Sequence, residues 1–523
     1  MKHYLSHLKS DIPAGVVVFL VALPLCLGIA MASGVPLFSG LIAGLVGGVL
    51  VSWLSGSQLS VAGPAAGLTA VVIAAIATLG SFEAFLLSVV VAGIIQLVVG
   101  FLKAGKLAAF FPASLIKGML AAIGLILIMK QLPHALGYLA NFNGGEPYSS
   151  HSEVLSFFWQ CINYLKSTSR GAILVCIGAI LLMKMWEILS KKWAVLSIVP
   201  GPLLAVIWGV WFNIVGSRWV IGAEMMSHHL VSLPVMNTLS DMMKHVRGPD
   251  FSQWANPNIY IVAGTLAIVA SIETLLSLEA ADKMDPLKRV APTDRELKAQ
   301  GIGNIVSGLM GGLPITAVIV RSAANVNAGG KTKVSAFVHG ILILVSVMFF
   351  SQYLNAIPLS CLAAILIMTG YKLTKPSLFL EMYRRGWTQF LPFVVTVVAI
   401  LSTDLLKGMG IGLIVSLCFV VRANFHSAIS VEREDDHYLI RFKKDVSFLN
   451  KMALRDSLLA IEPNSSVIID AAHAQFVDDD ILDTIFDFSI SAQDAGVRLK
   501  LLNFNIPKTF QHKGLTPNLD LSL

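Results

Sequence analysis

The feature that most constrains this chain is a succession of apolar segments that continues to about residue 425. A bilayer-spanning helix needs roughly 20 apolar residues, and fewer where the helix is broken. On that basis the sequence predicts fourteen spans, near residues 13–34, 37–54, 61–79, 84–102, 109–130, 170–190, 193–214, 258–279, 299–311, 315–328, 334–351, 357–374, 388–405 and 408–425. Only 13% of the residues are charged, too few to cover several soluble domains. The sequence therefore predicts a polytopic α-helical protein in a lipid bilayer, and it excludes a soluble enzyme or a disordered scaffold for most of the chain.

The distribution of charge predicts a domain boundary. From Glu432 to the end there are 15 acidic and 10 basic residues in 92 positions, whereas the preceding 431 residues hold 28 basic and 16 acidic residues. We therefore predict a transmembrane domain over 1–425 and a small soluble domain over 432–523. The net charge of +7 does not indicate nucleic-acid binding, because the basic excess belongs to the loops between spans.

The positions of the basic loop residues predict the topology. An even number of spans places both termini on one side, and loops rich in lysine and arginine stay in the cytoplasm. The loops on the side of the N-terminus contain Lys2, Lys9, Lys103, Lys106, Lys191, Lys192, Lys283, Lys288, Arg289, Arg295, Lys298, Lys331, Lys333, Lys372, Lys375, Arg384 and Arg385. The short opposite loops contain essentially Lys407. Both termini, and with them the acidic domain, are therefore predicted to be cytoplasmic.

Two segments differ from ordinary spans because small residues and a proline interrupt them. They run over residues 58–69 and 311–322, about 250 residues apart, and each is the third segment of a seven-segment half. Pro64 and Pro314 suit the first turn of a helix, so each segment is interpreted as an extended lead-in followed by a half-helix that begins in mid-membrane. Two half-helix N-termini that converge there would form an anion-binding cradle. Simple proline kinks are the alternative interpretation.

Two charged residues occur where charge is costly. Arg321 follows the second interruption and would add a positive charge to the cradle; alternatively it extends to the cytoplasmic surface or pairs with an acid. Glu273 lies near the middle of the eighth span, where an isolated acid usually faces a cavity or marks an ion path. A structural Glu273–Arg321 ion pair is the alternative that involves both residues.

Several motifs together make the chain resemble the SulP family of anion transporters. They are Leu23-Pro24, Ser60-Val-Ala-Gly-Pro-Ala65, Ser271-Ile-Glu273, Gly303-Asn304, Arg321-Ser322 and Asn327-Ala-Gly-Gly-Lys-Thr332. The resemblance covers nearly the whole chain and implies seven-plus-seven inverted repeats with two half-helices. It also implies a core domain of spans 1–4 and 8–11 and a gate domain of spans 5–7 and 12–14. A bacterial inner-membrane location and a homodimer are further expectations from this resemblance.

The resemblance also implies site residues. The anion-binding residues fall on Ala65, Ala66, Thr69, Val318, Ile319 and Arg321, and the coupling-ion residues on Glu273 and Thr316. The sequence departs from the family pattern in two places. Pro24 is followed by Leu25 where many members have glutamine, and residues 318–320 are apolar where many members have hydroxyl side chains. We therefore expect the anion to be held mainly by backbone N–H groups. The same departure puts sodium coordination by a hydroxyl of the tenth span in doubt.

The C-terminal region resembles the STAS regulatory domain that ends SulP chains. Alternation predicts a buried strand over 466–470, an amphipathic helix over 479–487 and a second strand over 497–502. The run Asp478–Asp480 could mimic a phosphate or bind a divalent cation, but a solvated helix N-terminus is the preferred interpretation.

Together these patterns predict secondary active transport of a small inorganic anion of the bicarbonate or sulfate class by alternating access. The predicted mode is symport with a proton or sodium. The alternatives are a nucleobase permease of the same inverted-repeat fold and a membrane-tethered sensor. An enzyme, a cofactor and a metal site are not expected, because HExxH, GxSxG and phosphate-loop motifs are absent and the five cysteines have no metal-ligand spacing.

Overall fold

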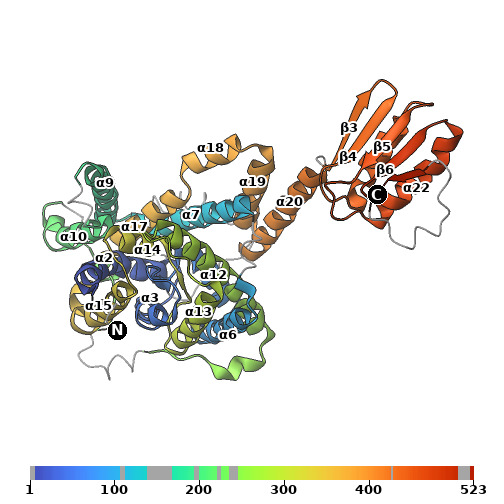
Figure 1. The fold of residues 1–523 in the computed structure, drawn as a ribbon. Coiled ribbons are helices and arrows are strands. Elements are labelled where there is room, and N and C mark those ends of the chain that lie inside the picture. Colours follow the sequence, from blue (N-terminus) through green and yellow to red (C-terminus); the bar gives the residue numbers. More distant parts are fainter. Residues whose placement is uncertain are drawn as a thin grey trace. The chain divides into compact units, whose positions relative to one another are not determined.

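The computed structural model describes residues 6–105, 112–137, 168–193, 199–220, 225–234, 246–403, 405–425, 428–504 and 519–522. Lys2 and Lys106 of the predicted cytoplasmic loops, and Cys161 among the five cysteines, lie outside these ranges. The chain forms two compact units, Met1–Leu413 and Ile414–Leu523. Figure 1 shows the helical unit and the unit built on a sheet.

Helices occur within every one of the fourteen predicted apolar segments. Six are long and apolar enough to cross a membrane, namely Leu8–Ala32, Leu37–Leu54, Phe82–Phe101, Ala113–Leu136, Arg170–Lys192 and Pro257–Met284. The helices of the first unit are α2 (Leu8–Ala32), α3 (Leu37–Val46) continued by a π-helical turn (Gly47–Val51) and α4 (Ser52–Leu54), α5 (Thr69–Leu79), α6 (Phe82–Phe101), α7 (Ala113–Leu136), α9 (Arg170–Lys192), α10 (Gly201–Ile214), α12 (Pro257–Met284), α13 (Thr293–Leu309), α14 (Ile319–Asn327), α15 (Val334–Phe349), α16 (Ser351–Leu354), α17 (Leu359–Leu373), α18 (Pro376–Arg384) and α19 (Trp387–Ser402). Helix α20 (Leu405–Phe425) extends from the first unit into the second. The short helix α18 was not predicted, because its length and polarity are those of a loop.

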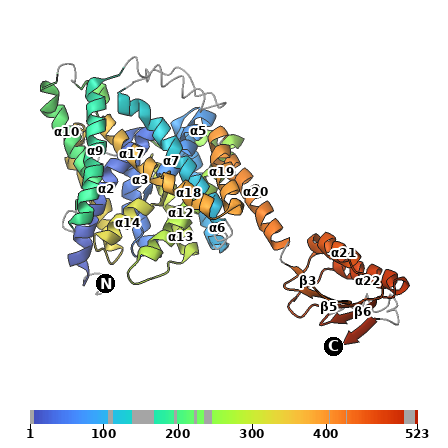
Figure 2. The ribbon, with the colours of Figure 1, turned by 90° about the horizontal axis from the view of Figure 1, so that it is seen from above.

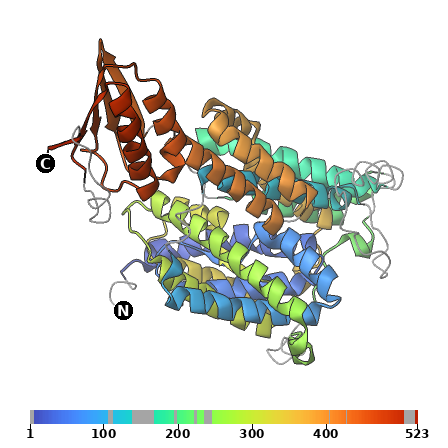
Figure 3. The same cartoon turned by 90° about the vertical axis from the view of Figure 1, so that its right-hand side faces the viewer.

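Helices that are distant in sequence pack side by side in the first unit. Helix α6 packs against α12 and α13, and α2 packs against α3, α14 and α15. Helices α17 and α19 pack against α7, while α10 and α17 pack against α9. Figures 2 and 3 show the same interleaving, with the blue N-terminal helices lying among the yellow and green helices of residues 257–349. The two halves of the apolar sequence thus share one hydrophobic core.

The two interrupted segments have the extended lead-ins that their sequences predict. Strand β1 (Ala62–Pro64) and strand β2 (Ile315–Ala317) pair antiparallel, with Gly63 opposite Thr316. A 3₁₀ turn (Ala66–Leu68) leads from β1 into α5, and α14 follows β2 after a single residue. Each proline therefore belongs to the extended stretch rather than to the first helical turn, since Pro64 lies within β1 and Pro314 lies immediately before β2.

The second unit is a five-stranded sheet with two helices. The strand order is β3 (Ile429–Glu434), β4 (His437–Phe442), β5 (Ser466–Asp470), β6 (Arg498–Leu502) and β7 (Leu519–Ser522). Strands β3 and β4 form an antiparallel hairpin, and the remaining neighbours are parallel. Helices α21 (Lys451–Leu459) and α22 (Asp479–Asp494) complete the unit. Strands β5 and β6 confirm the predicted strands, and α22 is longer than the predicted helix by seven residues.

The acidic run of this unit lies at the beginning of α22, as the preferred interpretation requires. The Asp478 carboxylate accepts hydrogen bonds from the Phe448 N–H at 3.0 Å and from the Asp480 N–H at 3.2 Å. Lys451 forms an ion pair with Asp480 at 3.2 Å. These contacts account for two of the three carboxylates as structural groups of a helix N-terminus.

Candidate functional site

The candidate site lies at the β1–β2 pairing, because each half-helix begins just after one of these strands. The first N–H groups of any helix have no partner within the helix. Such groups occur at the turn that starts at Ala66 and at α14, which starts at Ile319. Because the β1–β2 pairing is antiparallel, the turn at Ala66 follows its Pro64–Ile315 end and α14 follows its Ala62–Ala317 end. Two partly positive N-termini therefore flank the three-residue pairing of β1 and β2.

Buried side chains fix the position of this pairing. The Asn304 amide pairs with the backbone of Ile315 in both directions, accepting from its N–H at 2.6 Å and donating to its carbonyl at 3.2 Å. The same amide donates to Gln96 at 2.7 Å. The Thr274 hydroxyl accepts the Ala317 N–H, and the Ser322 hydroxyl accepts the Val61 N–H. Side chains from α12, α13 and α14 thus replace the neighbouring strands that a two-stranded sheet lacks, and Gln96 of α6 supports the Asn304 amide.

Glu273 lies at the N-terminus of the first half-helix. Its carboxylate accepts a hydrogen bond from the Gly67 N–H. A Cβ atom on Gly67 would lie 2.7 Å from Oε1 and 2.8 Å from Oε2 of this carboxylate. The Glu273 side chain is partly exposed, but its Oε2 atom is buried without a hydrogen-bond partner. A carboxyl group is therefore placed where the half-helix exposes its positive end, and it keeps an acceptor free.

Arg321 is completely buried and has no acidic partner among the described residues. Its exposed fraction is 0%, so it does not extend to the surface. Nη2 lies 3.4 Å from the Pro64 carbonyl oxygen and 3.4 Å from Cys26 Sγ, while Nε and Nη1 have no partner. Within the described part of the chain no carboxylate forms an ion pair with it, and Glu273 contacts Gly67 instead. The positive charge behind β1 is consequently uncompensated.

The other residues predicted for the site differ in what they can contribute. Ala66, Val318 and Ile319 are partly exposed, whereas Ala65, Thr69 and Thr316 are buried. The Val318 N–H donates to the Val61 carbonyl at 3.0 Å, so it is not free to bind an anion in this conformation. The Thr69 hydroxyl donates to the Ala66 carbonyl at 2.8 Å, and the Thr316 hydroxyl donates to the Ala317 carbonyl at 3.2 Å. Their hydroxyl oxygens remain available only as acceptors.

Sequence reasoning missed the residues that support the site. Asn304 and Ser322 belong to the motifs Gly303-Asn304 and Arg321-Ser322, but neighbouring residues do not reveal which groups these two side chains contact. Gln96, Thr274 and Cys26 were not singled out at all. A polar side chain inside a long apolar segment is the signal that could have identified Gln96 and Asn304, because such a group needs a buried partner.

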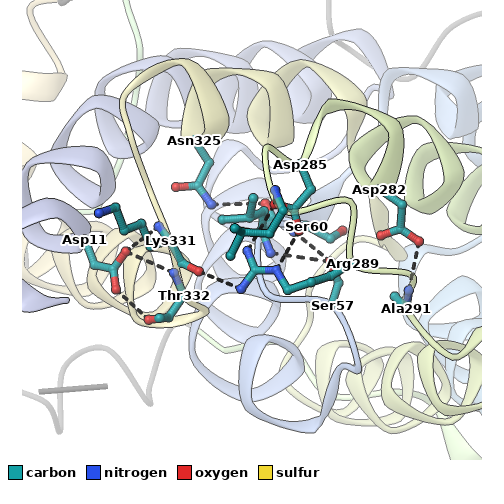
Figure 4. Close-up of polar contacts among 12 residues, drawn as sticks. Asp11, Ser57, Ser60, Asp282, Asp285, Arg289, Ala291, Asn325, Lys331 and Thr332 are labelled. Atoms are coloured by element: carbon teal, nitrogen blue, oxygen red, sulfur yellow. Dashed lines mark hydrogen bonds and ion pairs between the residues drawn. The ribbon is translucent and has the colours of Figure 1, made fainter. Parts of the chain in front are cut away.

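A second polar network holds the loop that follows α14 (Figure 4). The Asp11 carboxylate accepts hydrogen bonds from the Lys331 N–H at 2.7 Å and from the Thr332 N–H at 3.1 Å. Arg289 donates to the Lys331 carbonyl at 3.0 Å and forms an ion pair with Asp285 at 2.6 Å. Burial alone would raise the pKa of Asp285, but hydrogen bonds from Arg289 and from backbone N–H groups hold it below its usual value. The network joins α2, the α12–α13 loop and the end of the second half-helix.

Comparison with known proteins gives the family. The model of the sulfate permease family matches residues 8–399, about three quarters of the chain. This chain belongs to the sulfate permease family. It is therefore a multi-pass membrane transporter of an anion-transporting family rather than an enzyme, and its C-terminal α/β unit is consistent with a STAS domain.

Relatives and solved structures agree with the assignment. YvdB of Bacillus subtilis, provisionally named a sulfate transporter, is 26% identical over 447 residues, which cover 85% of this chain and 79% of YvdB. The bicarbonate transporter BicA of Picosynechococcus sp. is 25% identical over 79% of this chain and 70% of its own length. The structure of SLC26A9 matches with a TM-score of 0.75 at 17% identity, covering 95% of this chain and 84% of that one. Since this last identity is low, the likeness shows the fold alone.

Proposed function

We propose that this family member is a secondary active transporter that moves a small inorganic anion of the bicarbonate or sulfate class by alternating access. The observation that carries the proposal is Arg321, a fully buried positive charge with no acidic partner among the described residues. A buried charge is costly unless something pairs with it. An anion that enters the site would supply the missing charge.

The proposed anion position lies between the two half-helix N-termini. The first free N–H groups near Ala65, Ala66 and Ile319 would hold the anion, and Arg321 would act on it from behind β1. Because Val318 donates its N–H to Val61, its contribution would be limited to its side chain. Thr69 would shape the floor of the site.

We further propose that Glu273, with Thr316, forms the coupling-ion site for a proton or sodium. The unpartnered Oε2 atom supports this role, since a coupling ion needs an acceptor. The Thr316 hydroxyl retains acceptor capacity only, which suits a sodium ion better than a proton. The proposed symport uses either a proton or a sodium ion.

For the architecture we propose fourteen spans as seven-plus-seven inverted repeats, with spans 1–4 and 8–11 as the core domain and spans 5–7 and 12–14 as the gate domain. The membrane domain would occupy 1–425 and the STAS domain 432–523. Both termini would face the cytoplasm of a bacterial cell, and two copies would form a homodimer in the inner membrane. The packing of α6 against α13 and of α7 against α17 supports the two-domain division.

Uptake into proteoliposomes tests the proposal. Labelled sulfate, bicarbonate and uracil are offered separately under an imposed proton gradient, an imposed sodium gradient and no gradient. We expect one anion to accumulate and uracil not to accumulate. Uptake of uracil alone would instead establish the nucleobase permease, and binding without uptake of any of them would indicate a sensor.

Two substitutions assign the roles of the charged residues in the same assay. Arg321→Ala should raise the half-saturating anion concentration at least severalfold while the protein remains folded. Glu273→Gln should still bind the anion but should no longer concentrate it against a gradient, because the amide can neither lose a proton nor offer a full charge to sodium. A Glu273→Gln protein that concentrates the anion like the parent would make Glu273 structural.

A further inference from the structure

The hydrogen-bond partners of Arg321 are unusual for a buried arginine. A guanidinium has five N–H donors and is commonly matched by a carboxylate. Here the acceptors within reach are a thiol sulfur, Cys26 Sγ, and one carbonyl oxygen, that of Pro64, both near Nη2. His339 is also buried and within the electrostatic influence of Arg321, and neither of its ring nitrogens has a partner. A histidine contributes either no charge or a positive one, so it does not neutralise Arg321.

The Cys26 side chain is confined on both sides. It is completely buried on α2, and a Cβ atom added to Gly44 of α3 would lie 2.6 Å from its sulfur. On its other side is the Arg321 guanidinium, which in turn lies so close to β1 that a Cβ added to Gly63 would overlap Nη1. The thiol therefore fills the space between α3 and the guanidinium, and the guanidinium fills the space between the thiol and β1.

The chemistry of the thiol is suited to this place. A buried thiol in apolar surroundings resists ionisation, and its sulfur is a weak acceptor. It can thus support Nη2 without cancelling the charge. A carboxylate in the same position would form an ion pair with Arg321 and would compete with any anion for that charge.

We propose that Cys26 is a positioning residue for anion binding, which holds the Arg321 guanidinium against β1 through a neutral sulfur and so leaves its positive charge for the transported anion. This inference rests on the proposed anion transport. It assigns to α2 a role that depends on the absence of charge at position 26 rather than on a direct contact with the anion.

The test compares three substitutions at one position. Cys26→Ser keeps a small neutral acceptor, Cys26→Asn is neutral with the shape of aspartate, and Cys26→Asp adds the charge. The half-saturating concentration of labelled sulfate or bicarbonate, the maximal uptake rate and the melting temperature are measured for each purified protein. We expect Cys26→Ser and Cys26→Asn to stay within about threefold of the parent and Cys26→Asp to raise the half-saturating concentration by about tenfold or more.

Stability separates this role from a merely structural one. Since an aspartate would be paired with Arg321, the Cys26→Asp protein should melt no lower than Cys26→Asn, although it binds the anion more weakly. When each of these two substitutions is combined with Arg321→Gln, the two double variants should have the same half-saturating concentration, because the charge that the aspartate would cancel is gone.

Two results would overturn the inference. One is a half-saturating concentration for Cys26→Asp within threefold of that for Cys26→Asn. The other is equal weakening by all three substitutions together with equally lowered melting temperatures, which would mean that only packing matters. Failure of the parent protein to transport or bind any anion would be a different outcome, because it would remove the proposed function itself.

Discussion

The contact between Gly67 and Glu273 allows a sharp prediction for the substitution Gly67→Ala. The added Cβ would lie 2.7 Å from Oε1, 2.8 Å from Oε2 and 2.9 Å from Cδ of Glu273. Gly67 does not have a positive φ, so alanine suits its backbone, and the three atoms nearest to the added Cβ all belong to Glu273. The carboxylate must therefore move away from the start of the first half-helix.

The size of the effect follows from the geometry. The carboxylate must move by about 0.7 Å to bring the 2.7 Å separation to the 3.4 Å at which ordinary contact begins. Such a movement weakens or breaks its hydrogen bond from the Gly67 N–H. A hydrogen bond to the ionised form of this carboxyl group contributes about 1.5–3 kcal/mol, which corresponds to a factor of roughly 10 to 150. We expect the initial rate of gradient-driven anion uptake to fall at least about tenfold, which is the lower end of that range.

The assay is uptake of labelled anion into proteoliposomes under proton and sodium gradients, with the melting temperature as a check on folding. Gly264→Ala is the matched control, because Gly264 lies on the same helix as Glu273 and an added Cβ there meets no atom within 4 Å. This control should transport like the parent. If folded Gly67→Ala protein accumulates the anion at the parental rate, the Gly67–Glu273 contact does not matter for coupling and the reasoning is refuted.

Three further outcomes test the topology, the loop network and the support of the site. Single cysteines placed near Lys191 and near Lys288 of a cysteine-free protein should react with a membrane-impermeant reagent only from the cytoplasmic side; labelling of either in intact cells would contradict the fourteen-span topology. Asp285→Asn should lower the free energy of unfolding at neutral pH. Because Arg289 holds the Asp285 pKa of the folded protein below its ordinary value, the deficit should shrink as pH falls below about 4, where the unfolded parent chain takes up the proton before the folded one does. A deficit that is constant from pH 7 to pH 3 in denaturation curves would exclude the ion pair as its cause. Asn304→Ala should lower the free energy of unfolding by about 2–5 kcal/mol in chemical denaturation, because it leaves the buried N–H and carbonyl of Ile315 without the Asn304 amide. A decrease below about 1 kcal/mol would show that water or another side chain replaces the amide.

Local composition was sufficient for the general architecture. The length of each apolar segment depends only on neighbouring residues, and helices occur within all fourteen. The two prolines and their small neighbours predicted the extended lead-ins, since their backbone preferences act over one or two residues. Arg321 and Glu273 could be singled out because a charge in an apolar segment is costly wherever the segment lies.

The contacts of those charged residues were decided by the tertiary structure alone. Arg321 is 295 positions from Cys26 and 257 from Pro64 in sequence, and neither separation leaves a periodic signal. The sequence left open a Glu273–Arg321 pair, whereas the fold directs Glu273 to Gly67 and leaves Arg321 unpaired among the described residues. Just beyond the β1–β2 pairing, the Val318 N–H donates to the Val61 carbonyl, although the family resemblance had assigned Val318 to the anion site. Pairing register and side-chain direction depend on how distant helices pack, and apolar segments of similar composition do not specify that packing one by one.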